Sequence, residues 1–339
     1  MTDYVPFEDN EVSVNSQGGT ERTKRSIAAL IDPSIASNFQ IVCSRPRELL
    51  EDKIRVLWLH DLPNDTEIQI LATEEGRSKW HRLVFSSNWQ HQQFVDHMKI
   101  PWSVDHAVID TPVDPIRLDG PKSFDDGINL IYFSTPNRGL EVLLPVFEKL
   151  CETSTEKLHL DVFSSFKIYG WDEMDKQYEP LYERCRRNPN ITYHGFAPNE
   201  EVRACLARSH IFAYPSIWQE TSCRCLIESM SAGLVCVHPA YGALADTSGG
   251  LTAMYPMDSS IQKHADLHYV NLMQAIQNVK NERVQEYLKF VKAYADSRFN
   301  LEKSGKIWEG FLKTALNTYW TIESRTFPKL EKVFRYRTV

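Results

Sequence analysis

Two glutamates in one segment have the chemistry and spacing of a ligand-binding site. Glu220 and Glu228 lie eight residues apart within residues 212–237, FAYPSIWQETSCRCLIESMSAGLVCV. Carboxylates accept hydrogen bonds from hydroxyl groups, so a ribose and a sugar ring would each suit one of them. Thr221 or Ser222 is expected to cap a helix, whose first amides favour an anion such as phosphate. The alternative is that Glu220 only complements the helix dipole and that Glu228 is solvated.

Three further positions fall where an expected strand ends or an expected helix begins. His60 directly follows one apolar run, and Arg138 lies in the turn after another, where a guanidinium could stabilise phosphate charge. Gly18 and Gly19 precede a helix expected from Thr20, and glycine lets a backbone approach a ligand closely. The alternatives are a structural or solvated histidine and a flexible entry into the helix.

The elements that would position these residues alternate between short apolar strands and helices. Such alternation is typical of parallel sheets, in which ligands bind outside the carboxyl ends of the strands. A segment rich in Pro, Gly and Asp, residues 110–128, predicts a linker between two series of strands. The strands are expected at 39–43, 54–59, 83–85 and 107–109, and then at 128–133, 158–163, 191–194, 211–214, 234–237 and 251–255. Helices are expected at 199–207, 261–279, 283–297 and 301–320.

Length and composition indicate an ordinary globular protein of two domains. The chain has 339 residues, more than one hydrophobic core usually serves, with 42% hydrophobic and 24% charged residues. A net charge of −7 argues against nonspecific nucleic-acid binding. Seven cysteines without a repeating framework predict reduced thiols and a cytoplasmic location. Neither a signal peptide nor a transmembrane segment is expected, which leaves peripheral membrane contact open.

Several classes of enzyme are disfavoured by missing motifs. The chain has no Gly-x-Gly-x-x-Gly for a dinucleotide, no Gly-x-Ser-x-Gly nucleophile and no Walker loop. Cys223 and Cys225 form a Cys-x-Cys pair without further ligands at zinc spacing, so no metal site is expected.

The segment around the two glutamates resembles the retaining GT-B glycosyltransferases of family GT4. The hallmark of that family, Pro-Ser followed by two glutamates with seven residues between them, is met by Pro215, Ser216, Glu220 and Glu228, and the segment ends on Ala232-Gly233. Other stretches resemble the family in the same order, and the likeness covers about residues 15–320. They are QGGTE (17–21), WLHD (58–61), SSNWQ (86–90), IDTPVD (109–114), STPNRGLEVLL (134–144) and YHGFAPNEEV (193–202).

The resemblance implies a GT-B fold, an α/β architecture of two Rossmann-like domains that face each other across a cleft. Residues 1–118 would form the acceptor-side domain, reduced or trimmed at its start because no clear strand precedes Gly18. Residues 119–300 would bind the nucleotide sugar. Residues 301–339 would form a helix that packs back on the first domain, followed by a tail.

The resemblance also implies a role for each candidate residue. Glu228 would hold the ribose, Glu220 the donor sugar and Arg138 the diphosphate, and His60 would lie beside the transferred sugar. The catalytic pair would be His60 and Glu220. The remaining donor-binding groups would be the glycine turn and the helix-start amides, at Gly18, Gly19, Thr221 and Ser222.

The implied reaction is the transfer of a hexosyl group from a UDP- or GDP-sugar to a hydroxyl of a glycan or other acceptor. The anomeric configuration would be retained, without a cofactor or metal ion, and the absence of an Asp-x-Asp motif agrees with this. Alternatives are a noncatalytic protein that binds a nucleotide sugar or glycan, and a nucleotide-sugar epimerase.

Two departures from the family pattern bear on the diphosphate. Many members carry two basic residues around the turn after this strand, but the first slot, near Phe133 and Ser134, is not basic here. Diphosphate binding would then rest on Arg138 and a second cation, for which Lys167 is a candidate. The usual glycine-rich stretch after the first glutamate is replaced by Thr-Ser-Cys.

Overall fold

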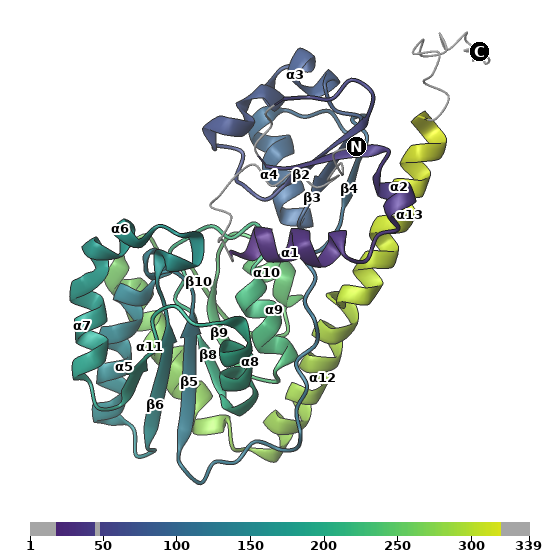
Figure 1. The fold of residues 1–339 in the computed structure, drawn as a ribbon. Coiled ribbons are helices and arrows are strands. Elements are labelled where there is room, and N and C mark those ends of the chain that lie inside the picture. Colours follow the sequence, from purple (N-terminus) through teal and green to yellow (C-terminus); the bar gives the residue numbers. More distant parts are fainter. Residues whose placement is uncertain (1–17, 45–47, 320–339) are drawn as a thin grey trace, which may run out of the picture.

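The computed structural model describes residues 18–44 and 48–319, which fold around two parallel sheets (Figure 1). The first sheet has the strand order β1-β2-β3-β4 and the second has the order β10-β9-β8-β5-β6-β7. We call the parts built on them the first domain and the second domain. The predicted α/β class with two parallel sheets is confirmed. The strands are β1 (Phe39–Cys43), β2 (Ile54–Leu59), β3 (Arg82–Phe85), β4 (His106–Val108), β5 (Ile128–Phe133), β6 (Leu158–Phe163), β7 (Ile191–Tyr193), β8 (Ile211–Ala213), β9 (Val235–Ala240) and β10 (Ala253–Pro256).

Helices connect and cover these strands in both domains. The first domain contains α1 (Gly19–Ala28), α2 (Pro33–Ala36), η1 (Thr66–Ala72), α3 (Glu74–Ser78) and α4 (Asn88–Met98). The second contains η2 (Pro136–Arg138), α5 (Leu140–Thr153), η3 (Phe166–Tyr169), α6 (Asp172–Asp175), η4 (Lys176–Tyr178), α7 (Glu179–Arg187), α8 (Asn199–Arg208), α9 (Arg224–Ser231), α10 (Leu244–Ser248), α11 (Ile261–Asn278) and α12 (Glu282–Arg298). The last described helix is α13 (Leu301–Tyr319).

The first sheet is buried on both faces because its strands are apolar on both sides. Along β2, Trp58 points to the core shared with α1, α2 and α13, and Leu57 points to the core shared with η1 and α4. Successive strand residues face opposite sides of a sheet, which explains this division. Trp58 is buried against Trp308 of α13, with 4.5 Å between the ring centroids.

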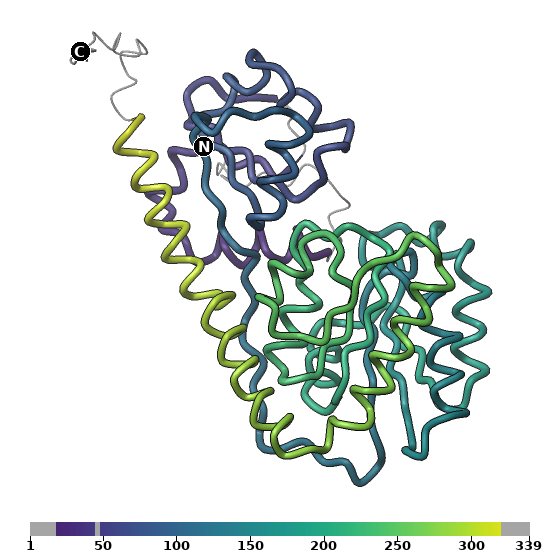
Figure 2. The backbone as a smooth tube through the Cα atoms, turned by 180° about the vertical axis from the view of Figure 1, so that it is seen from behind, coloured from purple at the N-terminus to yellow at the C-terminus, as the bar shows by residue number. Residues whose placement is uncertain are grey.

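The helix α13 belongs to the first domain in space although it follows the second domain in sequence. It leaves the end of α12 and runs along the first domain, where it contacts α1, α2 and β2 (Figure 2). The backbone N–H of Leu301 donates to the carbonyl of Val113, 3.1 Å away, at the start of this crossing. The predicted return of the C-terminal helix is therefore present. None of the described helices is both long and apolar enough to span a lipid bilayer.

The order of strands in the second sheet opens a crevice where β5 meets β8. From β5 the chain moves outward through β6 and β7, and it then returns to build β8, β9 and β10 on the other side. Neighbouring parallel strands whose connections leave in opposite directions form a topological switch point, where ligands bind outside the carboxyl ends. The turn with Arg138 follows β5 and the loop with Glu220 follows β8, so both lie at this point.

Candidate functional site

A cavity of about 680 Å³ lies between the carboxyl ends of the two sheets. Its volume is within the range typical of small-molecule sites. Ser44, His60 and Ser86 line it directly after β1, β2 and β3, and loops and helices of the second domain line the other side. All of the predicted site residues except Gly18 are among its lining residues, namely Gly19, His60, Arg138, Glu220, Thr221, Ser222 and Glu228.

Arg138 and Glu220 bind each other inside this cavity. The Nη1 group of Arg138 donates a hydrogen bond to Oε1 of Glu220, and the hydroxyl of the buried Tyr214 donates to the same oxygen over 2.6 Å. Burial lowers the pKa of Arg138, but attraction to Glu220 and smaller contributions from two tyrosines outweigh it and leave that pKa well above its ordinary value. The guanidinium is therefore held charged beside a carboxylate whose position Tyr214 fixes.

Gly139 lets these two residues meet. Its φ of +126° is costly for any residue with a side chain, and a Cβ there would lie 2.1 Å from the carbonyl oxygen of Pro215. The turn after β5 thus packs directly on the loop that leads to Glu220. The Nε2 atom of His264, in α11, lies 3.2 Å from the same Pro215 oxygen and so also contacts this loop.

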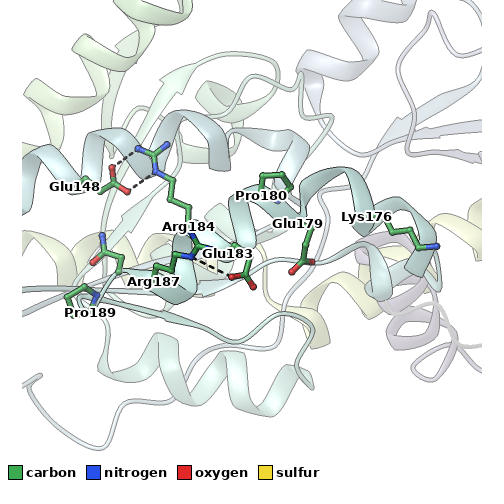
Figure 3. Close-up of a pocket in the computed structure, with 9 residues that line it drawn as sticks. Glu148, Lys176, Glu179, Pro180, Glu183, Arg184, Arg187 and Pro189 are labelled. Atoms are coloured by element: carbon green, nitrogen blue, oxygen red, sulfur yellow. Dashed lines mark hydrogen bonds and ion pairs between the residues drawn. The ribbon is translucent and has the colours of Figure 1, made fainter.

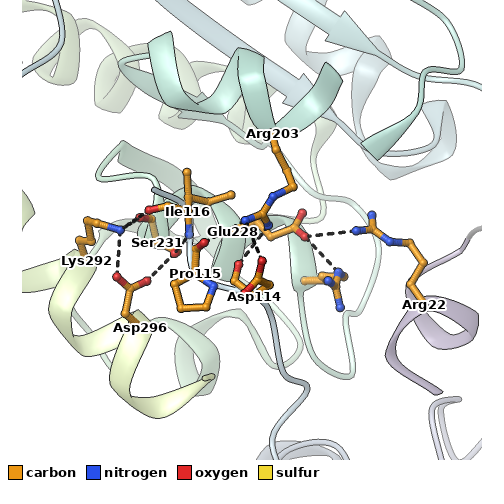
Figure 4. Close-up of polar contacts among 10 residues, drawn as sticks. Arg22, Asp114, Pro115, Ile116, Arg203, Glu228, Ser231, Lys292 and Asp296 are labelled. Carbon is orange, nitrogen blue, oxygen red and sulfur yellow. Dashed lines mark hydrogen bonds and ion pairs between the residues drawn. The ribbon is translucent and has the colours of Figure 1, made fainter. Parts of the chain in front are cut away.

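Glu228 is surrounded by arginines that the sequence analysis did not single out. It lies in α9 and is buried, and it accepts a hydrogen bond from Nε of Arg224 over 3.1 Å. Arg22 of α1 reaches the same oxygen from the first domain, 3.9 Å away (Figure 4). Burial and repulsion by Arg224 lower the pKa of Arg22, and Glu228 partly offsets this. The spacing of Arg224 and Glu228 by four residues in a helix was the available signal; nothing comparable pointed to Arg22.

His60 presents an unprotonated imidazole to the cavity. Burial, with a smaller contribution from Lys24, lowers its pKa to about 3. Its ring lies 4.7 Å from that of Trp58, and its backbone N–H donates to Ser44 Oγ over 2.9 Å. Its Nε2 is buried without a hydrogen-bond partner among the described residues. Such an imidazole is a weak base, suited to hydrogen bonding rather than to accepting a proton near neutral pH.

The glycine turn differs from its prediction at one of the two positions. Gly19 begins α1 and lines the cavity, and a Cβ added there would meet no atom within 4 Å. Gly18 is buried instead, and a Cβ there would lie 2.4 Å from the ring of Tyr169. Its φ of −60° is open to any residue, so a glycine is needed here for space alone. The expected approach of Gly18 to a ligand is replaced by contact with Tyr169 of the second domain.

Thr221 and Ser222 line the cavity, but the prediction that one of them caps the following helix is wrong. That helix begins at Arg224, and its capping residue, Cys223, makes no side-chain cap hydrogen bond. The Thr221 hydroxyl donates to the carbonyl of His60 over 2.8 Å, across the cleft. Ser87 Oγ donates in turn to the carbonyl of Thr221 over 2.6 Å. Tertiary contact between domains has overridden the local capping preference.

Lys167 does not supply the second cation. Its side chain is 56% exposed, is absent from the cavity lining, and lies 3.6 Å from Asp172. Arg22 and Arg224 do line the cavity. Among the described residues, the positive charge of the site therefore comes from three arginines on three different segments.

Some buried polar atoms of the cavity lining have no hydrogen-bond partner among the described residues. The side-chain atoms of the lining that are buried without a hydrogen bond in the described part of the chain include Glu21 Oε2, His60 Nε2, Asn137 Oδ1 and Ser164 Oγ. Buried polar groups are rarely left unpaired, so these atoms fit a polar ligand. Within residues 18–44 and 48–319, no group of three or more His, Cys, Asp or Glu side chains could hold a metal ion.

A second cavity, of about 870 Å³, lies between α5 and α7 (Figure 3). Asn188 and Pro189 line it just before β7, so it opens near the amino end of that strand and away from the ligand-binding edge. Its charged side chains pair with one another, as Arg184 does with Glu148 through two hydrogen bonds of 2.8 and 2.5 Å. The first cavity is therefore the candidate site.

The chain is similar to known proteins in one segment and in its fold. Residues 132–249 match the family model of the glycosyl transferases group 1. No curated protein matches the chain in sequence. Among solved structures, a glycosyltransferase from Rickettsia africae is 14% identical, with a TM-score of 0.65, and the match covers 91% of this chain and 84% of that one. Sucrose-phosphate synthase from Thermosynechococcus elongatus is 13% identical, with a TM-score of 0.62 and coverage of 87% and 78%.

A third solved structure is Anabaena HepE in complex with UDP and glucose, which is 13% identical, with a TM-score of 0.60 and coverage of 88% and 83%. At such identities the likeness establishes the fold, and the predicted GT-B architecture is confirmed. The matched family segment contains Arg138, Glu220 and Glu228. The family match of residues 132–249 and the shared fold together support a transferase, one segment of which is similar to the glycosyl transferases group 1.

Proposed function

We propose that the protein is a retaining glycosyltransferase of family GT4 that moves a hexosyl group from a UDP- or GDP-sugar to a hydroxyl of a glycan or other acceptor. The observation that carries this proposal is the joint placement of Arg138, Glu220 and Glu228 in one cavity at the switch point of the second sheet. Cations for a diphosphate and carboxylates for hydroxyls are the two kinds of group that a nucleotide sugar requires. Two structures of similar fold are described as complexes with UDP and a sugar, HepE with glucose and the pneumococcal O-GlcNAc transferase GtfA with GlcNAc.

Each site residue has a separate role in this proposal. Glu228 binds the ribose hydroxyls, Glu220 binds the donor sugar, and the neutral His60 donates or accepts a hydrogen bond at the transferred sugar. The acceptor oxygen bonds to the anomeric carbon while the bond from that carbon to the diphosphate oxygen breaks. The hydroxyl proton passes to the departing diphosphate. Retention requires both events to occur on one face of the sugar.

The departing diphosphate is stabilised by protein charge in this proposal, without a metal ion or cofactor. Arg138, Arg22 and Arg224 line the cavity, and the amides at the start of α9 add partial positive charge. Seven free thiols fit a protein that works in the reducing cytoplasm. Insensitivity of turnover to EDTA would support metal independence, and cell fractionation would check the location.

A panel of UDP-, GDP-, dTDP- and ADP-sugars in a thermal-shift assay tests the proposal, because a bound donor raises the melting temperature by mass action. We expect a shift with a UDP- or GDP-sugar, weakened by Arg138→Ala, and an unchanged anomeric configuration in the NMR spectrum of the product. Arg184→Leu, in the second cavity, is the matched control. No shift with any donor would refute the proposal.

The unfilled basic slot at Phe133 favours one competing function. Phe133 is buried against Phe212. Because phenylalanine carries no charge, this position cannot help to stabilise a diphosphate. Donor binding without transfer to any acceptor would indicate a noncatalytic sugar-nucleotide-binding protein. Conversion of the donor sugar in the absence of an acceptor would indicate an epimerase.

A further inference from the structure

We propose that Arg224 is a positioning residue that docks the glycine turn of the first domain, Gly18-Gly19, above the Glu228 carboxylate of the second domain. This inference rests on the proposed function and adds to it how the two halves of the donor site are held in register. Besides the positive charge that it adds near the diphosphate, Arg224 has a positioning role that needs no contact with the reacting atoms. It acts through Glu228 on the ribose and through the turn on the phosphates.

Three contacts of one guanidinium carry the argument. Nε of Arg224 donates to Glu228 Oε1 over 3.1 Å, within α9. Its Nη1 donates to the carbonyl of Pro112 in the linker over 2.9 Å, and to Thr23 Oγ1 in α1 over 3.3 Å. The Arg224 side chain is 13% exposed, so these contacts are shielded from bulk water. A single side chain therefore joins the second domain, the linker and the first domain.

The contact with Thr23 continues to the glycine turn. Thr23 is fully buried, and its hydroxyl donates to the carbonyl of Gly19 over 2.7 Å. Arg224, Thr23 and Gly19 thus form a hydrogen-bonded chain from α9 to the residue that faces the cavity. On the other side of the turn, the ring of Tyr169 leaves no room for a Cβ at Gly18. The turn is held between two side chains of the second domain, one polar and one aromatic.

Charge balance argues against a purely structural ion pair. Glu228 is approached by two guanidinium groups, those of Arg224 and Arg22, and a pair alone would need only one (Figure 4). Burial and repulsion by Arg224 lower the pKa of Arg22, which shows that the arrangement has a cost. Two guanidinium groups beside one carboxylate leave a local excess of positive charge around Glu228, which is suited to a ligand that brings negative charge.

The two routes make separable predictions for ligand binding. Loss of the Arg224–Glu228 contact affects the ribose, and therefore both a nucleoside and its diphosphate. Loss of the Thr23 hydroxyl leaves the Arg224–Glu228 contact in place and disturbs only the turn, and therefore only a ligand with phosphates. Thr23→Val makes this change with little change in volume.

The test compares UDP with uridine, and GDP with guanosine, on the full chain by isothermal titration and ligand-observed NMR. We expect Arg224→Leu to weaken both diphosphate and nucleoside binding, and Arg224→Lys to restore part of the nucleoside affinity. Thr23→Val should weaken diphosphate binding by roughly tenfold, as expected for one lost hydrogen bond, and change nucleoside binding less than about twofold. Arg184→Leu, which removes a paired arginine from the second cavity, should change neither.

The outcomes separate the inference from the proposed function. If the wild-type protein binds neither UDP nor GDP, the proposed function fails and this inference falls with it. If the wild type binds one of them and Thr23→Val and Arg224→Leu bind it equally well, the docking role of Arg224 alone is wrong. Equal weakening of nucleoside and diphosphate by Thr23→Val would also overturn it, since that pattern marks a general disturbance. Circular dichroism melting curves show whether each variant is folded.

Discussion

Arg138 and Glu220 form a charge-assisted hydrogen bond across the switch point of the second sheet, although they follow different strands, β5 and β8. The family resemblance assigned them to different parts of the donor, the diphosphate and the sugar. Their direct contact means that neither can be altered without changing the charge environment of the other. Double substitution is therefore more informative here than single substitution.

We predict an energetic coupling between these two side chains. Arg138→Ala and Glu220→Ala should each destabilise the protein, because each leaves one partly buried charge without its partner. The double variant should lose less than the sum, with a coupling of about 1–3 kcal/mol. Urea unfolding of the four proteins measures this. Additive losses would show that the ion pair contributes no net stability.

Gly139→Ala should be strongly destabilising. The new methyl group would meet the Pro215 carbonyl at 2.1 Å in a backbone conformation that disfavours side chains. We expect a loss of at least about 2 kcal/mol in the free energy of unfolding, with weaker donor binding as Arg138 moves. Gly310→Ala is the control, since Gly310 lies in α13 with no atom within 4 Å of a new Cβ, and it should be neutral or stabilising by up to about 1 kcal/mol. Equal effects of the two substitutions would contradict the proposed strain.

His60→Ala should lower turnover without changing affinity for the nucleoside diphosphate. The Nε2 atom of His60 lies in the cavity without a hydrogen-bond partner among the described residues, and its proposed role is at the transferred sugar. Loss of one aligned hydrogen bond to the transition state should reduce kcat by roughly 10²-fold. Because its pKa is about 3, the wild-type rate should show no loss attributable to protonation of His60 between pH 5 and 8. A matching rise in Kd for UDP would show that His60 binds the nucleotide instead.

Stability should fall as the pH is lowered from about 6.5 to about 4. Burial lowers the pKa values of His238 and His210 to about 4, whereas the unfolded chain takes up these protons near 6.5. In this range the unfolded state binds more protons than the folded state, so acid favours unfolding. Each buried histidine should cost about 2 kcal/mol of stability between pH 7 and 5.

The measurement is urea unfolding at pH 7 and pH 5, with His238→Gln as the test variant. His238 is fully buried, so its replacement should reduce the pH dependence whatever it does to stability itself. His97→Gln, which replaces a histidine at an exposed position of α4, is the matched control. Identical pH dependence in His238→Gln and the wild type would contradict the assignment.

The strands could be predicted because their signals are local. The apolar runs at 39–43, 54–59 and 128–133 coincide with β1, β2 and β5, and βα alternation sufficed for two parallel sheets. The predicted start of α9 was wrong because the Thr221 hydroxyl donates to the carbonyl of His60 in the first domain. It does not cap the nearby helix amides. A pattern within one segment cannot show a hydrogen bond to a residue 161 positions away.

The same distinction divides the site residues. Glu220, Glu228 and Arg138 were found from their types and from the strand ends beside them, and they line one cavity. Tyr214 was hidden inside an apolar run, where a tyrosine that orients a carboxylate looks like any other core residue. The contact of Tyr169 with Gly18 joins segments about 150 residues apart and depends on how the domains meet.

The return of α13 to the first domain has a consequence for how the chain is made. Trp308, Leu312 and Ala315 are buried in the core on one face of the first sheet, together with residues of α1 and β2. A ribosome synthesises these side chains only after the whole second domain. One apolar face of the first sheet therefore stays uncovered until α13 has been synthesised. The second domain can complete its own core before the first domain does.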